Sequence, residues 1–133
     1  MQIMKRGSNS RLVLALGPDN EAHAGLREML DSAGYRVLAG YTVRRSTRVL
    51  DEISVVICED VLPDGTWRDV LAALDQVKPR PALIITSRAT GPHLWAEVLN
   101  LGGYDVLAQR FSNQAVLWSV QHARSSEATA PMR

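Results

Sequence analysis

The sequence predicts one α/β domain whose core is a doubly wound, five-stranded parallel sheet with helices on both faces. Two observations support this fold class. Short apolar segments alternate along the chain with longer segments of helical periodicity, which is the pattern of repeated βαβ units. The chain of 133 residues, 46% of them hydrophobic, also has the size of one domain with a continuous core. The predicted strands are residues 11–16, 35–39, 53–58, 82–86 and 104–108.

The first strand and the first helix have clear ends in the sequence. The apolar run of residues 11–16 stops at Gly17-Pro18, which neither continues a strand nor fits a helix interior. Asp19 or Asn20 then supplies an N-cap for a helix that begins at Glu21 and ends at Gly34. Its apolar stripe, spaced by three and four residues, is Ala22, Leu26, Met29, Leu30 and Ala33.

Charge distinguishes the second strand and helix from the third strand. Arg36 interrupts residues 35–39, which predicts a strand near the edge of the sheet. The short helix expected at residues 42–50 carries Arg44, Arg45 and Arg48, and a solvated face is the favoured interpretation, with a nucleic-acid contact as the alternative. Residues 53–58 are almost entirely apolar and rich in β-branched side chains, which predicts the central strand.

Punctuation residues also divide the second half of the chain. Thr66 caps a third helix, and a fourth helix is expected at residues 92–100 before the break at Gly102-Gly103. Ser112 or Asn113 opens a last helix that runs to about residue 123. The residues expected to point inward are Val70, Leu71, Leu74 and Val77 of the third helix and Leu94, Val98 and Leu101 of the fourth.

The domain is expected to span residues 11–123. The basic, polar residues 1–10 read as a loose arm, and the small, polar residues 124–133 read as a frayed tail. No internal repeat or second domain is evident.

Charge, cysteine and histidine content narrow the range of partners. Fifteen basic and fourteen acidic residues give a net charge of +1, so nucleic acid and membrane are unlikely partners. The apolar run near the N-terminus is too short for a signal peptide or a membrane span, and the single Cys58 suits a core thiol in a reducing cytoplasm. His23, His93 and His122 lie far apart, which predicts histidines on the surface or on a helix face and no metal site.

Four segments of the chain, in order and spacing, resemble the receiver domain of bacterial two-component response regulators. The first helix carries Leu26 and Leu30 before Gly34-Tyr35, and the third strand is followed by Leu62-Pro63-Asp64-Gly65. The fourth strand ends in Thr86-Ser87, and Gly102-Gly103-Tyr104-Asp105 precedes the fifth. The resemblance covers residues 11–123 and implies the flavodoxin-like strand order 2-1-3-4-5.

The resemblance also implies a phosphorylation site, and this chain departs from it. In the family an aspartate four residues before the loop proline accepts a phosphoryl group from a histidine kinase, and Glu59 stands there. The two acidic residues that hold Mg²⁺ in the family correspond to Gly17 and Pro18, so no Mg²⁺ or other cofactor is expected. The lysine that pairs with the phosphoryl group corresponds to Gln109.

The switch residues are only partly kept. The hydroxyl residue of the family's switch is present as Thr86, whereas its aromatic partner corresponds to Val106. The proline that follows the family's lysine corresponds to Arg110, so we predict a trans peptide between Gln109 and Arg110.

These departures favour signalling by protein–protein interaction, without phosphorylation and without enzymatic turnover. Glu59 is either a fixed mimic of the phosphorylated aspartate or an ordinary carboxylate at a strand end. A phosphorelay receiver that accepts phosphate at Asp60 is one alternative, disfavoured because strand alternation turns Asp60 away from Glu59. Another is a small nucleotide- or ligand-binding domain that uses the crevice after the first and third strands.

Two tryptophans mark a candidate interface. Trp95 and Trp118 lie off the apolar stripes of the last two helices, where they either form one exposed face or cap an edge of the core. In receiver domains the face built from the fourth helix, fifth strand and fifth helix mediates contacts. A homodimer or another protein, including a histidine kinase, is the expected partner.

Overall fold

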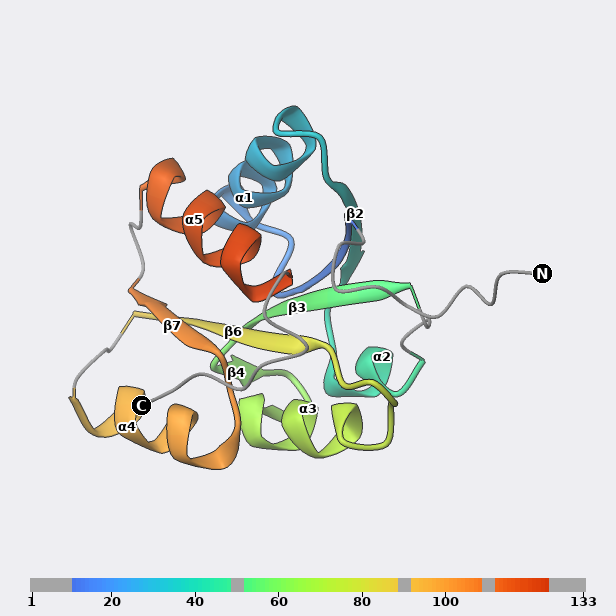
Figure 1. Ribbon diagram of the computed structural model, residues 1–133, viewed down its shortest axis with the longest axis vertical. Coiled ribbons are helices and arrows are strands. Elements are labelled where there is room, and N and C mark those ends of the chain that lie inside the picture. The colour runs from blue at the N-terminus through green and yellow to red at the C-terminus, as the bar shows by residue number, and fades with distance from the viewer. Residues whose placement is uncertain (1–10, 49–51, 89–91, 109–111, 125–133) are drawn as a thin grey trace.

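The five long strands form a single parallel sheet in the order β2-β1-β3-β6-β7, as predicted (Figure 1). The computed structural model describes residues 11–48, 52–88, 92–108 and 112–124. Strand β3 lies at the centre of the sheet and β2 at one edge. The apolar side chains of β3 are buried on both faces, whereas β2 carries the exposed Arg36. Its strands are β1 (Leu12–Leu16), β2 (Arg36–Gly40), β3 (Ile53–Glu59), β6 (Ala82–Ser87) and β7 (Asp105–Ala108).

Helices cover both faces of this sheet. In Figure 1, α1 and α5 lie above the sheet, and α2, α3 and α4 lie below it. None of the helices in the described part of the chain is long and apolar enough to cross a membrane. The helices are α1 (Glu21–Ser32), α2 (Val43–Ser46), α3 (Trp67–Leu74), α4 (Pro92–Leu101) and α5 (Asn113–Arg124).

Strand alternation divides the buried side chains into two cores. Val55 and Ile57 face α1 and α5, while Val56 and Cys58 face α3 and α4. The expectation that Cys58 is a core thiol is confirmed, and burial raises the pKa of that thiol well above its usual range.

The predicted helix caps are present. Asn20 accepts a hydrogen bond from the backbone of His23, and Ser112 accepts one from Ala115. Thr66 forms a capping box, in which the Asp69 carboxylate accepts from the Thr66 backbone at 3.0 Å. Gly34 ends the first helix with φ of 95°, a backbone conformation that favours glycine.

Two local features differ from the sequence-based expectation. The loop after β3 contains a short antiparallel hairpin, β4 (Val61–Leu62) and β5 (Gly65–Thr66), around the predicted Pro-Asp turn. The helix expected at residues 42–50 is only α2, because the hydroxyls of Ser46 and Thr47 donate back to backbone carbonyls and compete with helix extension.

Three positions predicted to face inward were wrong. Leu101 is 51% exposed, since it is the last residue of α4 and the chain turns at Gly102, whose φ is 109°. Ala22 and Ala33 are exposed, and His23 takes the inward position with Leu26 and Leu30. The buried stripe of α1 therefore keeps the helical spacing but begins one residue later.

Candidate functional site

The carboxyl ends of β1, β3 and β6 bring three of the predicted site residues together. Glu59 is paired with Thr86 in the register of β3 and β6. Leu16, at the end of β1, is paired with Cys58, so Gly17 follows beside Glu59. Val106 lies on β7, the next strand after β6 in the sheet, and pairs with Ile85 of β6. Pro18 continues from Gly17, while Gln109 and the Gln109–Arg110 peptide lie outside the described residues.

The side chains of Glu59 and Asp60 lie on opposite faces of the sheet, as strand alternation predicts. Glu59 continues the side of Ile57, which faces α1 and α5. Asp60 continues the other side, where its carboxylate accepts a hydrogen bond of 2.8 Å from the buried Ser87 hydroxyl. The backbone N–H of Asp60 also donates to the Thr86 carbonyl at 2.9 Å. Asp60 is thereby anchored on the side away from Glu59.

His23 is the site residue that the sequence reasoning missed. Its side chain is only 6% exposed, so of the two positions expected for the histidines, the surface and a helix face, His23 takes the second, on the buried face of α1. A Cβ atom placed on Gly17 would lie 2.7 Å from His23 Nδ1 and 3.1 Å from Glu59 Cγ. His23 and Glu59 therefore pack against Gly17 from α1 and from β3. The available signal was the spacing of residues 23, 26 and 30, which is as helical as that of the apolar stripe.

Burial sets the titration of His23. Desolvation lowers the pKa of its imidazole, and the nearby Arg27 guanidinium lowers the pKa further because it opposes a second positive charge. The Asp19 carboxylate and a backbone hydrogen bond with Ala15 raise the pKa and so act in the opposite direction. The Nε2 atom is buried and has no hydrogen-bond partner within the described residues. A neutral imidazole is thus favoured in the folded protein.

The residues at this edge do not fit a magnesium ion. Mg²⁺ requires oxygen ligands in near-octahedral geometry, and neither Gly17 nor Pro18 has a side-chain oxygen. Within the described ranges, no group of three or more His, Cys, Asp or Glu side chains lies close enough to hold a metal ion. The space beside Gly17 is moreover taken by carbon and nitrogen atoms of its neighbours.

A hollow is present at this edge, but on the far side of β1 from β3. It has a volume of about 330 Å³ and lies where β1, β2 and α1 meet. The ligand-binding alternative expected a crevice after the first and third strands instead. At that place the side chains of His23 and Glu59 pack against Gly17. The lining residues of the hollow are Gly17, Asp19, His23, Arg27, Ala39, Gly40 and Tyr41.

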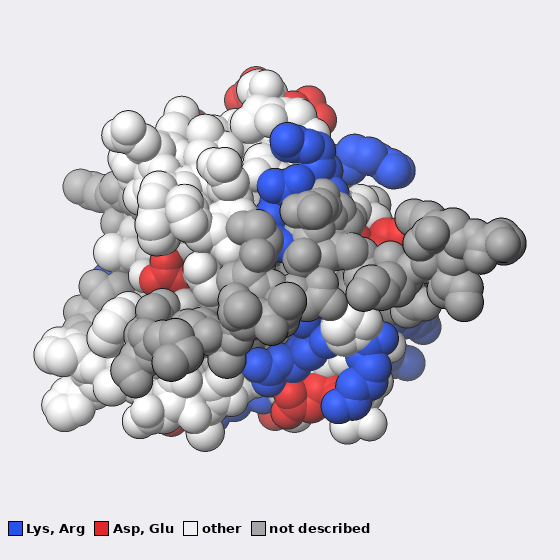
Figure 2. All heavy atoms as spheres, viewed as in Figure 1, with Lys and Arg blue, Asp and Glu red and all other residues white. Residues whose placement is uncertain are grey.

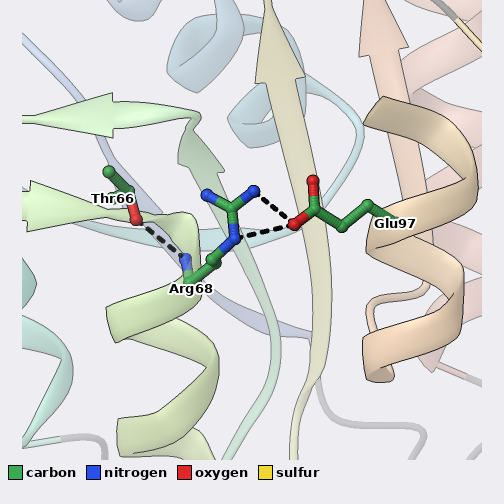
Figure 3. A network of polar contacts seen from close by, with 3 residues as sticks. All are labelled: Thr66, Arg68 and Glu97. Atoms are coloured by element: carbon green, nitrogen blue, oxygen red, sulfur yellow. Dashed lines mark hydrogen bonds and ion pairs between the residues drawn. The ribbon is translucent and has the colours of Figure 1, made fainter. Parts of the chain in front are cut away.

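The loop after β3 is fastened to α2, and the helix that follows the loop is linked to α4. Asp64 accepts hydrogen bonds from the backbone N–H groups of Val43 and Arg44, at 2.7 and 3.1 Å. The bond from Val43 is the main reason that the pKa of Asp64 is lowered. At the other end of the hairpin, Arg68 forms an ion pair with Glu97 of α4, which links α3 to α4 (Figure 3).

The tryptophans of α4 and α5 are exposed, which confirms that they lie off the core stripes. Trp95 is 50% and Trp118 is 57% exposed. The Trp118 ring stacks on His122, with ring centroids 3.8 Å apart. The third tryptophan, Trp67, is the first residue of α3 and is instead buried in the core.

Solved structures similar to this chain are receiver domains. A CheY-like receiver domain from Methanospirillum hungatei JF-1 superposes with a TM-score of 0.76 over 90% of this chain and 98% of that chain, at 14% identity. The beryllofluoride-activated NtrC4 receiver domain dimer gives a TM-score of 0.77 at 21% identity, over 88% of this chain and 98% of that chain. The chain therefore has the CheY-like receiver fold.

Sequence comparison points the same way. The transcriptional regulatory protein CpxR of Klebsiella pneumoniae is 26% identical over 132 residues, which cover 90% of this chain and 56% of the relative. CpxR of Escherichia coli K12 is 26% identical over 79% of this chain and 45% of its own length. The chain thus spans about half the length of these curated relatives. No family model matches it.

Proposed function

We propose that this domain is a receiver-like signalling module that acts by protein–protein contact, without phosphorylation and without enzymatic turnover. The observation that carries the proposal is the exposure of Trp95 on α4 and Trp118 on α5, the two helices that flank β7 from below and above the sheet. Large aromatic side chains are enriched at protein interfaces, because they bury much apolar area at little cost in side-chain entropy.

The geometry of α4 supports the orientation of Trp95 toward the surface of α4, β7 and α5. Glu97 points to α3, where it binds Arg68. Trp95 precedes Glu97 by two residues, which is about 200° around an α-helix. Trp95 therefore points away from α3, on the side of α4 that faces β7.

Helix α5 borders the same surface from the other side of the sheet. Its Ser119 hydroxyl donates to the Asp105 carboxylate of β7 at 2.7 Å, and Trp118 is the residue before Ser119. Figure 1 shows α5 above β7 and α4 below it. In the same view, the side chains drawn over α5 and α4 are mostly white, whereas blue side chains gather elsewhere (Figure 2). A surface with few charges and exposed tryptophans suits a protein partner better than nucleic acid.

The proposed partner is a second copy of the chain or another signalling protein, a histidine kinase among them. Sedimentation velocity of the full chain over a range of concentrations tests self-association. We expect a dimer that is lost in the double variant Trp95→Ala/Trp118→Ala and kept in Tyr41→Ala, which removes an equally exposed aromatic ring elsewhere. Unchanged association of the double variant would refute this surface as the interface.

Independence from phosphorylation is proposed because the residues at the carboxyl edge of the sheet do not fit Mg²⁺. Incubation of the chain with acetyl phosphate and Mg²⁺, followed by intact mass measurement, tests it. We expect no phosphoryl adduct, with a phosphorylatable receiver domain as the positive control. An adduct on the wild-type chain that is lost in Asp60→Asn would establish the alternative in which Asp60 is the acceptor.

A further inference from the structure

Gly17 has no backbone reason to be glycine. The positive-φ glycines in the described part of the chain are Gly34 and Gly102, so the conformation at Gly17 admits other residues. What excludes them is the surroundings. An added Cβ would lie 2.7 Å from His23 Nδ1 and 3.1 Å from His23 Cε1, and real Cβ contacts are essentially never as short as the first of these.

We propose that His23 occupies the space of a side chain at position 17, so that Gly17 and His23 are a coupled pair that closes the carboxyl edge of β1 to divalent cations. The loss of acidic residues at positions 17 and 18 is then only half of the change. The other half is the His23 ring of α1, which occupies the space. This inference deepens the proposed phosphorylation-independent function, on which its significance rests, but it concerns the packing of the site and not the interface.

The environment of His23 supports a space-filling role. Its Nε2 atom is buried without a hydrogen-bond partner among the described residues, and an unpaired buried polar atom is unfavourable. The ring lies with its other nitrogen and Cε1 against Gly17, where it fills volume.

The packing part of the inference is tested by thermal unfolding of the full chain in a double-mutant cycle. Gly17→Ala is expected to lower the melting temperature by several degrees in the wild-type background. The same change in the His23→Ala background is expected to lower it by less than half as much. Gly25→Ala, where an added Cβ meets nothing within 4 Å, is the control for adding a methyl group to α1 and is expected to lower it in neither background. Equal losses from Gly17→Ala with and without His23 would overturn the coupling.

The cation part is tested by restoring carboxylates. The triple variant Gly17→Asp/Pro18→Asp/Glu59→Asp is compared with the same variant carrying His23→Ala, and Mg²⁺ is titrated while backbone amide shifts are followed. We expect saturable shifts near residues 17 and 59 only when His23 is replaced. Saturable binding in both variants, or in neither, would overturn the claim that His23 closes the site. Dispersed amide spectra verify that each variant is folded, and neither outcome depends on the Trp95 and Trp118 surface.

Discussion

Replacing Ser87 by alanine is the most direct perturbation of the carboxyl edge of the sheet. The Ser87 side chain is fully buried, and its hydroxyl donates to the Asp60 carboxylate at 2.8 Å. Hydrogen bonds to charged groups contribute about 1.5–3 kcal/mol. Asp60 is only half-buried, so water replaces part of the lost bond, and we expect Ser87→Ala to lower the free energy of unfolding by about 1–2 kcal/mol.

Urea unfolding followed by circular dichroism measures this loss. With a slope of about 1.5 kcal/mol per molar urea, the midpoint is expected to fall by about 1 M at an unchanged slope. Asp60→Asn is expected to cost less, because the amide oxygen still accepts from Ser87. Thr47→Ala, which removes an exposed hydroxyl, is the control and is expected to stay within about 0.5 kcal/mol of the wild type. A Ser87→Ala midpoint equal to that of the wild type would refute the view that Ser87 anchors Asp60.

Further predictions address α1, α3 and the α3–α4 link. Gly25→Ala is expected to stabilise the chain by about 0.5–1 kcal/mol, seen as a higher melting temperature, because Gly25 is inside α1 with open space around it. Thr66→Ala, measured by urea unfolding, is expected to cost about 1 kcal/mol because it removes the cap of α3. Glu97→Gln is expected to cost less than about 1 kcal/mol, a loss that disappears at high salt, since the pair with Arg68 is exposed. The free energy of unfolding of the wild type is expected to fall as the pH drops below 6.5. The reason is that the pKa of His23 is lowered in the folded state, so the unfolded chain takes up the proton first. In urea unfolding measured from pH 7 downward, the midpoint of His23→Gln should not show this fall.

Strand alternation and helix punctuation made most of the fold predictable. The apolar run at residues 53–58 located the central strand, and the charge in residues 35–39 located the edge. Thr66 was identified as a cap because a hydroxyl residue stood directly before a helical stripe, and its capping box with Asp69 is present. These predictions succeeded because they depend on local chemistry that the fold does not override.

The candidate site was less predictable because it depends on which side chain fills a space between elements. Counting from Pro63 and Gly34 identified Glu59, Gly17 and Pro18, and the structure places Glu59 beside Gly17. The helical spacing of His23 with Leu26 and Leu30 indicated a buried side chain, but not that its ring would lie against Gly17. Polar residues are usually assigned to the solvent side of an amphipathic helix, and His23 is an exception at the buried position before Leu26.

The packing of the site constrains how such a domain receives a signal. A ligand shifts a conformational equilibrium only by the difference in its affinity for the two states. A phosphoryl group on aspartate supplies that difference in an ordinary receiver, and the proposed function removes it. Within the proposal, input therefore comes through the partner itself. The fraction of domain in the bound state is then set by the concentration and affinity of the partner at the α4, β7 and α5 surface.

A variant that weakens that surface should abolish output, whereas Glu59→Gln, which removes the charge but keeps the side chain's size, should leave binding of the partner unchanged. A loss of binding in Glu59→Gln would instead support the interpretation of Glu59 as a fixed mimic of the phosphorylated state.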